Sequence, residues 1–274
     1  MAFTPTPRTA LSLTRAIGRI TLVSIQAVGQ LSVLFGQVWL SFLRQPQRRR
    51  TIVLQLYHIG FLSLPVVLLT GLSTGLVLAV QAYYTLKTVS GESMTGAMVN
   101  FALVSELGPV LTGLMLAGRV GSSIAAEIGS MKVTEQLDAL RVMGTDPVAY
   151  LVAPRFLACV LLMPILTVMC VVVGIYGANV LAMTVWDIDQ GAYWSKHRAY
   201  IDSWDIATGL CKSLIFGGII ALVACRKGLR TSGGAAGVGT ACTEGVVTAS
   251  VLILVSDFVL TLIFQAVASR LGFG

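Results

Sequence analysis

Long apolar runs alternate with short polar segments along this chain, and the apolar runs have the length of membrane-spanning helices. A helix that crosses the hydrocarbon core of a bilayer needs about 20 predominantly apolar residues. Five runs meet this requirement: Ile59–Tyr84, Ala97–Gly118, Phe156–Trp186, Ile206–Cys225 and Gly245–Ser269. The pattern therefore predicts an all-α integral membrane protein with five transmembrane helices.

A further apolar segment, Ile20–Leu43, carries polar side chains at helical spacing. They recur along the segment and its flanks at Arg15, Arg19, Gln26, Gln30, Gln37, Ser41 and Arg44. On a helix these positions fall within an arc of about 80°. A helix with such a polar stripe lies in the membrane interface more readily than it crosses the bilayer. We therefore predict an interfacial helix within an N-terminal region 1–50, followed by a membrane domain 51–274.

Composition and charge agree with a membrane protein of defined orientation. The chain is 55% hydrophobic and only 11% charged, whereas soluble domains carry about 25% charged residues. Of its 19 basic residues, thirteen fall on the side of the N-terminus, while four (Lys87, Lys196, Arg198 and Arg270) fall on the other side. The positive-inside rule then places the N-terminus in the cytosol. The net charge of +7 thus reflects topology, and we expect no nucleic-acid partner.

Sequence signatures of catalytic or metal chemistry are absent. The five cysteines form no CxxC pair, and the two histidines are isolated from each other. No G-x-x-x-x-G-K-[ST], HExxH or GxSxG motif occurs in the chain. We therefore predict no metal site, no cofactor and no enzymatic activity in this chain.

Three charged residues fall inside predicted spans. At 1.5 Å per residue, Glu106, Lys212 and Asp257 lie about 15, 10 and 12 Å from the outer boundary of the hydrocarbon core. An unpaired charge there costs about 2.5–3.5 kcal/mol, so we expect the three side chains to cluster. The cluster either holds the helices together or forms a polar site that contacts a headgroup or gates a cavity, and the sequence leaves both open.

Small residues recur every fourth position along the second predicted span and beyond it, at Gly113, Ala117, Gly121, Ala125 and Gly129. Small residues at this spacing let helix backbones approach closely in lipid, so we predict close packing here and along the similar series Gly71, Gly75 and Ala79. Gly108–Pro109 is expected to kink the helix and to free backbone groups beside Glu106.

The segment Val133–Met143 is amphipathic but too short to span. Gly144 is suited to end a helix there, and Asp146–Pro147 to begin the next one. The segment is either a connector on the inner leaflet or a helix that docks on a cytosolic partner, and its spacing alone does not decide. The glycine-rich segment Gly228–Gly239 is predicted to be a flexible cytosolic turn.

Several of these segments together resemble one family. The motifs are Glu106-Leu-Gly-Pro-Val-Leu, Ala117-Gly-Arg-Val-Gly, Ala126-Glu-Ile-Gly-Ser-Met-Lys-Val-Thr-Glu-Gln-Leu-Asp-Ala-Leu, Met143-Gly-Thr-Asp-Pro, Pro154-Arg, Gly233-Gly-Ala-Ala-Gly-Val-Gly and Asp257-Phe-Val-Leu-Thr. In this order they resemble the MlaE (YrbE) permease family, over about residues 50–265.

The resemblance implies the permease subunit of an ATP-driven phospholipid transporter in the bacterial inner membrane. Such a permease forms a homodimer beneath a ring of periplasmic MCE proteins, and two cytosolic ABC ATPase subunits bind the ATP. A small cytosolic accessory subunit is a further expected partner. By the same resemblance, Ile20–Leu43 is the interfacial elbow helix. Val133–Met143 is the coupling helix between spans two and three, with ATPase contacts at Glu135, Leu137, Asp138 and Arg141.

The resemblance also implies a lipid cavity between the protomers, open to the periplasm. The matching positions are Leu78, Tyr83, Thr85, Leu86, Val89, Glu106 and Leu107. Ser105 stands where the family can carry a basic residue, so Lys212 is the cation expected near Glu106. Two other classes stay open: a secondary transporter or channel with a proton relay through Glu106, Lys212 and Asp257, and a structural scaffold for the MCE ring.

Overall fold

The computed structural model describes residues 29–42, 49–88, 91–186 and 202–271, together with residues 18, 22, 25, 26 and 191. This part of the chain is almost entirely helical and contains no strand. It includes five helices that are long and apolar enough to cross a membrane. The prediction of an all-α fold with five spans is therefore confirmed.

The spans are assembled from consecutive helical pieces. The first, Thr51–Lys87, lies in α2 (Arg49–Gly60), η1 (Phe61–Ser63) and α3 (Leu64–Lys87). The short helix η2 (Glu92–Met94) precedes the second span, Thr95–Val133. This span consists of three α-helices, α4 (Thr95–Ala102), α5 (Gly108–Leu116) and α6 (Ser122–Val133). Two π-helical turns join them, η3 (Leu103–Leu107) and η4 (Ala117–Gly121). The other spans are η5 (Val148–Val152) with α8 (Ala153–Val185), then α10 (Ser203–Leu229), then α11 (Gly234–Leu271).

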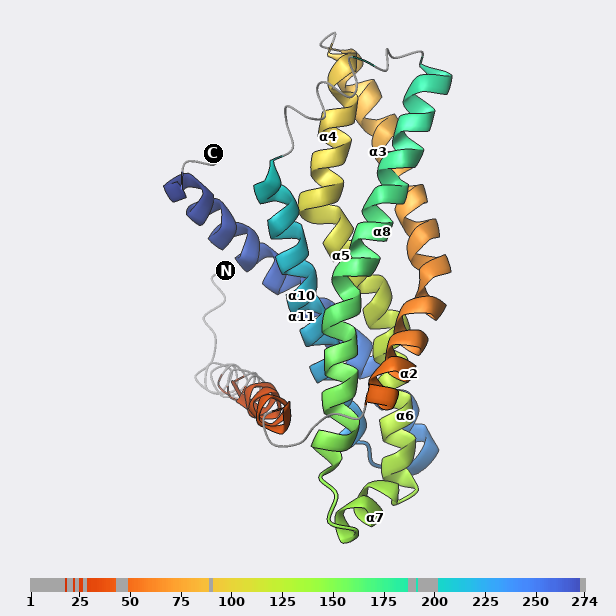
Figure 1. The fold of residues 1–274 in the computed structure, drawn as a ribbon, viewed down its shortest axis with the longest axis vertical. Coiled ribbons are helices and arrows are strands. Elements are labelled where there is room, and N and C mark those ends of the chain that lie inside the picture. Colours follow the sequence, from red (N-terminus) through yellow and green to blue (C-terminus); the bar gives the residue numbers. More distant parts are fainter. Residues whose placement is uncertain are drawn as a thin grey trace, which may run out of the picture.

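The short helix α7 (Gln136–Val142) lies beyond the spans, at one end of the molecule. Figure 1 shows it at the opposite end from the top of α3 and α4. In the same view α11 leans away from the other spans toward its C-terminus. In the most apolar 18-residue stretch of each helix, only 11% of the residues of α11 are buried, against 44% of those of α10. One long face of α11 is therefore free to meet lipid or a second protein.

The turn between α10 and α11 corrects one prediction. Instead of a flexible segment from Gly228 to Gly239, α10 continues to Leu229 and α11 begins at Gly234. Gly233 and Gly234 adopt φ values of +89° and +69°. These values are accessible to glycine without strain, so the chain reverses at this pair and the later glycines are helical.

Residues 29–42 are helical, as expected for the predicted interfacial helix. Leu34, Val38 and Ser41 are buried and share one face. The ring of Phe35 packs edge-on against Phe156 of α8, with centroids 5.9 Å apart. This helix is therefore attached to the bundle, and its position relative to a membrane remains a prediction.

The ladder of small residues is buried between helices, as predicted. A methyl group at Gly113 would lie 3.4 Å from Phe216 of α10 and 3.5 Å from Ile253 of α11. Gly121 faces Ile220 in the same way. Without side chains at these positions, the second span packs closely against both of the last two spans.

Helices α3 and α8 bring their backbones close together at two glycines of α3. A Cβ atom at Gly75 would overlap the backbone carbonyl of Gly174, and one at Gly71 would overlap that of Cys170. A backbone carbonyl cannot rotate away as a flexible side chain can. The packing predicted for the first span is thus confirmed at both glycines.

This contact gives a stability prediction. Gly75→Ala is expected to lower the free energy of unfolding by about 1–3 kcal/mol, because the added methyl group must separate the two helices. Thermal unfolding of the purified chain in detergent measures the loss. The control is Gly118→Ala on the second span, where a Cβ atom meets nothing within 4 Å. Equal melting temperatures for the two variants would contradict the close approach.

Candidate functional site

The three intramembrane charges form one cluster, centred on Lys212 of α10. Its Nζ lies 2.5 Å from Glu106 Oε2 of η3 and 3.1 Å from Asp257 Oδ1 of α11. It also donates hydrogen bonds to Thr261 Oγ1 at 2.8 Å and to the Ser105 carbonyl at 3.2 Å. Since only 1% of Lys212 is exposed, its charge is compensated almost entirely by the protein. The predicted clustering of Glu106, Lys212 and Asp257 is thus present.

The proline in the second span explains one of these contacts. Pro109 has no backbone N–H, so the carbonyl of Ser105, four residues earlier, loses its helical donor. The helix widens into a π-turn at this point, over Leu103–Leu107. Lys212 takes the place of the missing donor. The expectation that Gly108–Pro109 frees a backbone group beside Glu106 is confirmed.

Thr261 completes the cluster and was not among the predicted site residues. Its hydroxyl lies 3.2 and 3.3 Å from the two carboxylate oxygens of Glu106, and 2.9 Å from the Asp257 carbonyl. The available signal was its spacing, because a residue four positions after Asp257 shares its helix face. Thr261 therefore links two of the charged helices through an uncharged group.

The cluster has more negative than positive charge. One ammonium faces two carboxylates, and the side chain of Glu106 is 38% exposed while that of Asp257 is 19% exposed. The accessible edge of the cluster is thus a carboxylate on a π-turn, a local geometry found often at functional sites. Both interpretations left open by the sequence, helix linkage and ligand contact, are compatible with this arrangement.

The residues predicted to line a lipid cavity lie in different environments. Thr85 borders an open, largely apolar pocket of about 800 Å³, together with Leu76, Val77, Val80, Gln81, Tyr84 and Leu181. Tyr83 is instead buried and stacks on Trp186, with ring centroids 4.1 Å apart. Within one chain, therefore, only part of the predicted set shares a pocket.

The other members of the set are distributed over two spans. Leu78 packs against the buried cluster of Ala79 and Leu103. Leu86, Glu106 and Leu107 are half-buried. Val89 lies outside the described residues. The lipid cavity between protomers remains a prediction.

The predicted coupling helix corresponds to α7. Glu135 precedes it with φ of +60°, a left-handed conformation that turns the chain sharply after α6. Gly144 ends it with φ of +73°, as predicted for its cap. Leu137 is 1% exposed and packs into the core of this chain. Leu137 thus anchors α7, and the exposed apolar residues are Val142 and Met143, at 88% and 70%, which sequence reasoning missed.

Ion pairs stabilise the orientation of α7. Asp138 lies 3.0 Å from Lys132 of α6 and 3.0 Å from Arg141. The hydrogen bond from Lys132 lowers the pKa of the Asp138 carboxyl below its usual value of 3.8. A carboxyl whose pKa is lowered by folding stabilises the folded state at pH values above its unfolded pKa. The contacts of Asp138 therefore persist at neutral pH and are lost only as the pH falls below 3.8.

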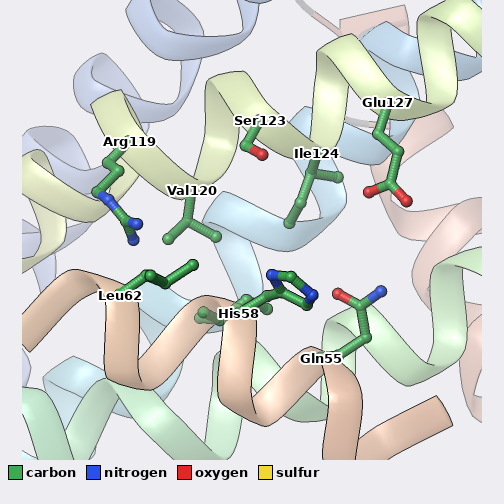
Figure 2. Close-up of a pocket in the computed structure, with 9 residues that line it drawn as sticks. Gln55, His58, Leu62, Arg119, Val120, Ser123, Ile124 and Glu127 are labelled. Carbon is green, nitrogen blue, oxygen red and sulfur yellow. The ribbon is translucent and has the colours of Figure 1, made fainter.

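A second polar region lies between α2 and α6, here termed the α2–α6 pocket. It has a volume of about 390 Å³ and is lined by Gln55, His58, Ile59, Leu62, Arg119, Val120, Ser123, Ile124 and Glu127. Figure 2 shows the His58 ring and the Arg119 guanidinium in the space between the helices, with the Glu127 carboxylate opposite the Gln55 amide. Sequence reasoning did not identify this pocket.

Comparison with known proteins gives consistent matches. The sequence model described as Permease MlaE matches residues 52–263. The chain is 41% identical over 254 residues to a probable ABC transporter permease protein of Rickettsia felis, covering 93% of this chain and 98% of the relative. It is 37% identical over 253 residues to the intermembrane phospholipid transport system permease protein MlaE of Haemophilus influenzae, covering 90% and 95%.

A plant protein is also similar. The chain is 40% identical over 233 residues to the chloroplastic protein TRIGALACTOSYLDIACYLGLYCEROL 1 of Arabidopsis thaliana, covering 85% of this chain and 66% of the relative. The residues matched by the family model include the charge cluster and α7. On this evidence the chain, a multi-pass membrane protein, belongs to the MlaE permease family.

Proposed function

We propose that this chain is the permease subunit of an ABC transporter that moves phospholipids between the bacterial inner membrane and a periplasmic MCE carrier. ATP binds to separate cytosolic subunits. Two relatives support this role, because one is named as an ABC transporter permease and another as the permease of an intermembrane phospholipid transport system.

The observation that carries the proposal is the continuity of the second span. From Thr95 to Val133 one continuous span carries Glu106 of the charge cluster at η3 and is joined to α7 by the turn at Glu135. Movement of α7 is thereby transmitted to the membrane interior. The exposed Val142 and Met143 give α7 an apolar surface for the ATPase, as in helix-in-groove recognition. Glu135, Asp138 and Arg141 supply charged contacts beside that surface.

The remaining partners belong to the same proposal. Two copies of the chain enclose the lipid cavity, and the exposed face of α11 supports such a pairing. A ring of MCE proteins receives the lipid at the end opposite α7, and a small accessory subunit joins the complex on the cytosolic side. The N-terminus and α7 are cytosolic in this arrangement, consistent with the distribution of basic residues.

The test is lipid transfer by the natively purified complex. Mass spectrometry first identifies the copurifying subunits and lipids, and the complex is then reconstituted with labelled phospholipid. We expect transfer to the MCE carrier to require ATP hydrolysis. Transfer that follows a pH gradient without ATP would favour the proton relay instead. A complex that carries no lipid and transfers none would favour a structural scaffold.

A further inference from the structure

The α2–α6 pocket has no role in the mechanism proposed above. Arg119, Ser123 and Glu127 follow one another at four-residue spacing, so they share one face of the second span. Gln55 and His58 of α2 face them across the pocket (Figure 2). Both helices belong to candidate membrane spans. Within those spans, the pocket lies at and beyond the ends of the predicted apolar runs Ile59–Tyr84 and Ala97–Gly118, where water or a lipid headgroup can reach its polar side chains.

The charges in this pocket are separated along its length. Arg119 Nη1 donates to the neutral hydroxyl of Ser63 at 2.5 Å, and no carboxylate pairs with it in the part of the chain that the structure describes. At the other end, Glu127 Oε1 lies 2.8 Å from Nη2 of the buried Arg155, while the Glu127 side chain as a whole stays 54% exposed. The pocket thus presents a free cation at one end and an accessible carboxylate at the other.

The order of these charges matches that of a zwitterionic lipid. The predicted apolar run of this span ends at Gly118, so Arg119 lies at the membrane boundary. Glu127 lies about 12 Å further along the helix, toward α7. In a phospholipid of the α7-side leaflet, the phosphate is attached through glycerol to the acyl chains, and the amine is attached beyond the phosphate. Leu62 and Val120 provide apolar contacts close to Arg119.

We propose that the α2–α6 pocket binds the headgroup of a zwitterionic phospholipid with a primary ammonium. Arg119 and His58 bind the phosphate, and Glu127 and Gln55 accept hydrogen bonds from the ammonium. A quaternary ammonium is recognised mainly by aromatic faces, and the pocket contains no phenylalanine, tyrosine or tryptophan. The inference rests on the proposed function only for the cytosolic position of α7 and for contact with phospholipid.

The first test uses the unmodified full-length chain. It is placed in lipid nanodiscs with equal amounts of phosphatidylethanolamine, phosphatidylglycerol and phosphatidylcholine, and retained lipids are measured by native mass spectrometry. We expect at least about tenfold preference for phosphatidylethanolamine, the equivalent of one charge-assisted hydrogen bond. Retention should fall stepwise for the N-methyl and N,N-dimethyl headgroups. Equal retention across this methylation series would overturn the proposal.

Matched variants then assign the preference to this pocket. Glu127→Gln should remove the preference among headgroups, whereas Arg119→Gln should lower retention of all three lipids. Glu244→Gln is the control, because Glu244 is also an exposed carboxylate paired with a basic residue, Lys227, and lies outside the pocket. An unchanged preference in Glu127→Gln, or an equal loss in Glu244→Gln, would refute the assignment.

These measurements are separate from the test of transport. Lipid retention requires no ATP, ATPase or MCE protein. The headgroup preference can therefore be absent while ATP-dependent transfer is observed, and it can be present while no transfer is observed. The methylation series also needs no substitution. It therefore remains decisive even if loss of the Glu127 partner leaves the buried Arg155 uncompensated and the variant unfolds.

Discussion

Lys212→Ala is expected to lower the free energy of unfolding by about 3–5 kcal/mol, the range measured when one partner of a buried ion pair is removed. The substitution leaves two carboxylates close together, with no cation between them. It also removes the Lys212 donor to the Ser105 carbonyl, whose usual helical donor is missing at Pro109. Reversible unfolding in mixed detergent micelles measures the loss, and lipid transfer should fall with it.

Adding Asp257→Asn to Lys212→Ala should restore part of this stability. The second substitution removes the more buried of the two uncompensated carboxylates, Asp257, and keeps an amide of similar shape. We expect the double variant to be more stable than Lys212→Ala by at least about 1 kcal/mol, within the usual range for coupled neighbours. Strictly additive effects of the two substitutions would show that Lys212 and Asp257 are not paired. Lys212→Met, which preserves most of the volume, separates the electrostatic effect from the cavity effect.

The spans could be predicted from the sequence because the length of an apolar run alone distinguishes a membrane helix. Their ends could not. The helices continue past the hydrocarbon core, so α11 begins at Gly234 whereas the apolar run begins near Gly245. Glycine-rich composition signals a turn only when the fold requires a reversal, and here two glycines, Gly233 and Gly234, are sufficient.

The charge cluster was also accessible to sequence reasoning, because depth in a membrane follows from residue number. Glu106, Lys212 and Asp257 could be placed at similar heights on three helices without knowledge of their packing. Thr261 could not be assigned, since a threonine in a membrane helix usually bonds to its own backbone. Thr261 does so as well, and it reaches Glu106 in addition.

The α2–α6 pocket shows a different limit of sequence analysis. Its polar stripe on the second span starts where the apolar run ends, so it resembles an ordinary membrane boundary. Only the position of α2 reveals that Gln55 and His58 face that stripe. Contacts between separate spans depend on helix rotation, which hydropathy does not determine.

The surface of α7 shows a similar limit. A short amphipathic segment indicates that one face is buried, but it does not indicate whether the apolar face meets its own chain or a partner. The left-handed Glu135 turns α7 so that Leu137 enters the core. Val142 and Met143 are therefore left as the apolar residues available to a partner.

Met143→Asp is expected to abolish copurification of the ATPase and ATP-dependent lipid transfer. An unpaired carboxylate buried at an interface costs about 3 kcal/mol or more, which corresponds to over a hundredfold loss of affinity. Met143 is 70% exposed in the isolated chain, so the melting temperature of the Met143→Asp variant should equal that of the unmodified chain. Ser232→Asp introduces the same charge at an exposed site in the α10–α11 turn and should leave the complex intact. A Met143→Asp chain that still binds the ATPase would show that the apolar tip of α7 is not the docking surface. Leu137→Ala should give the opposite pattern, with a lower melting temperature because a buried anchor is lost.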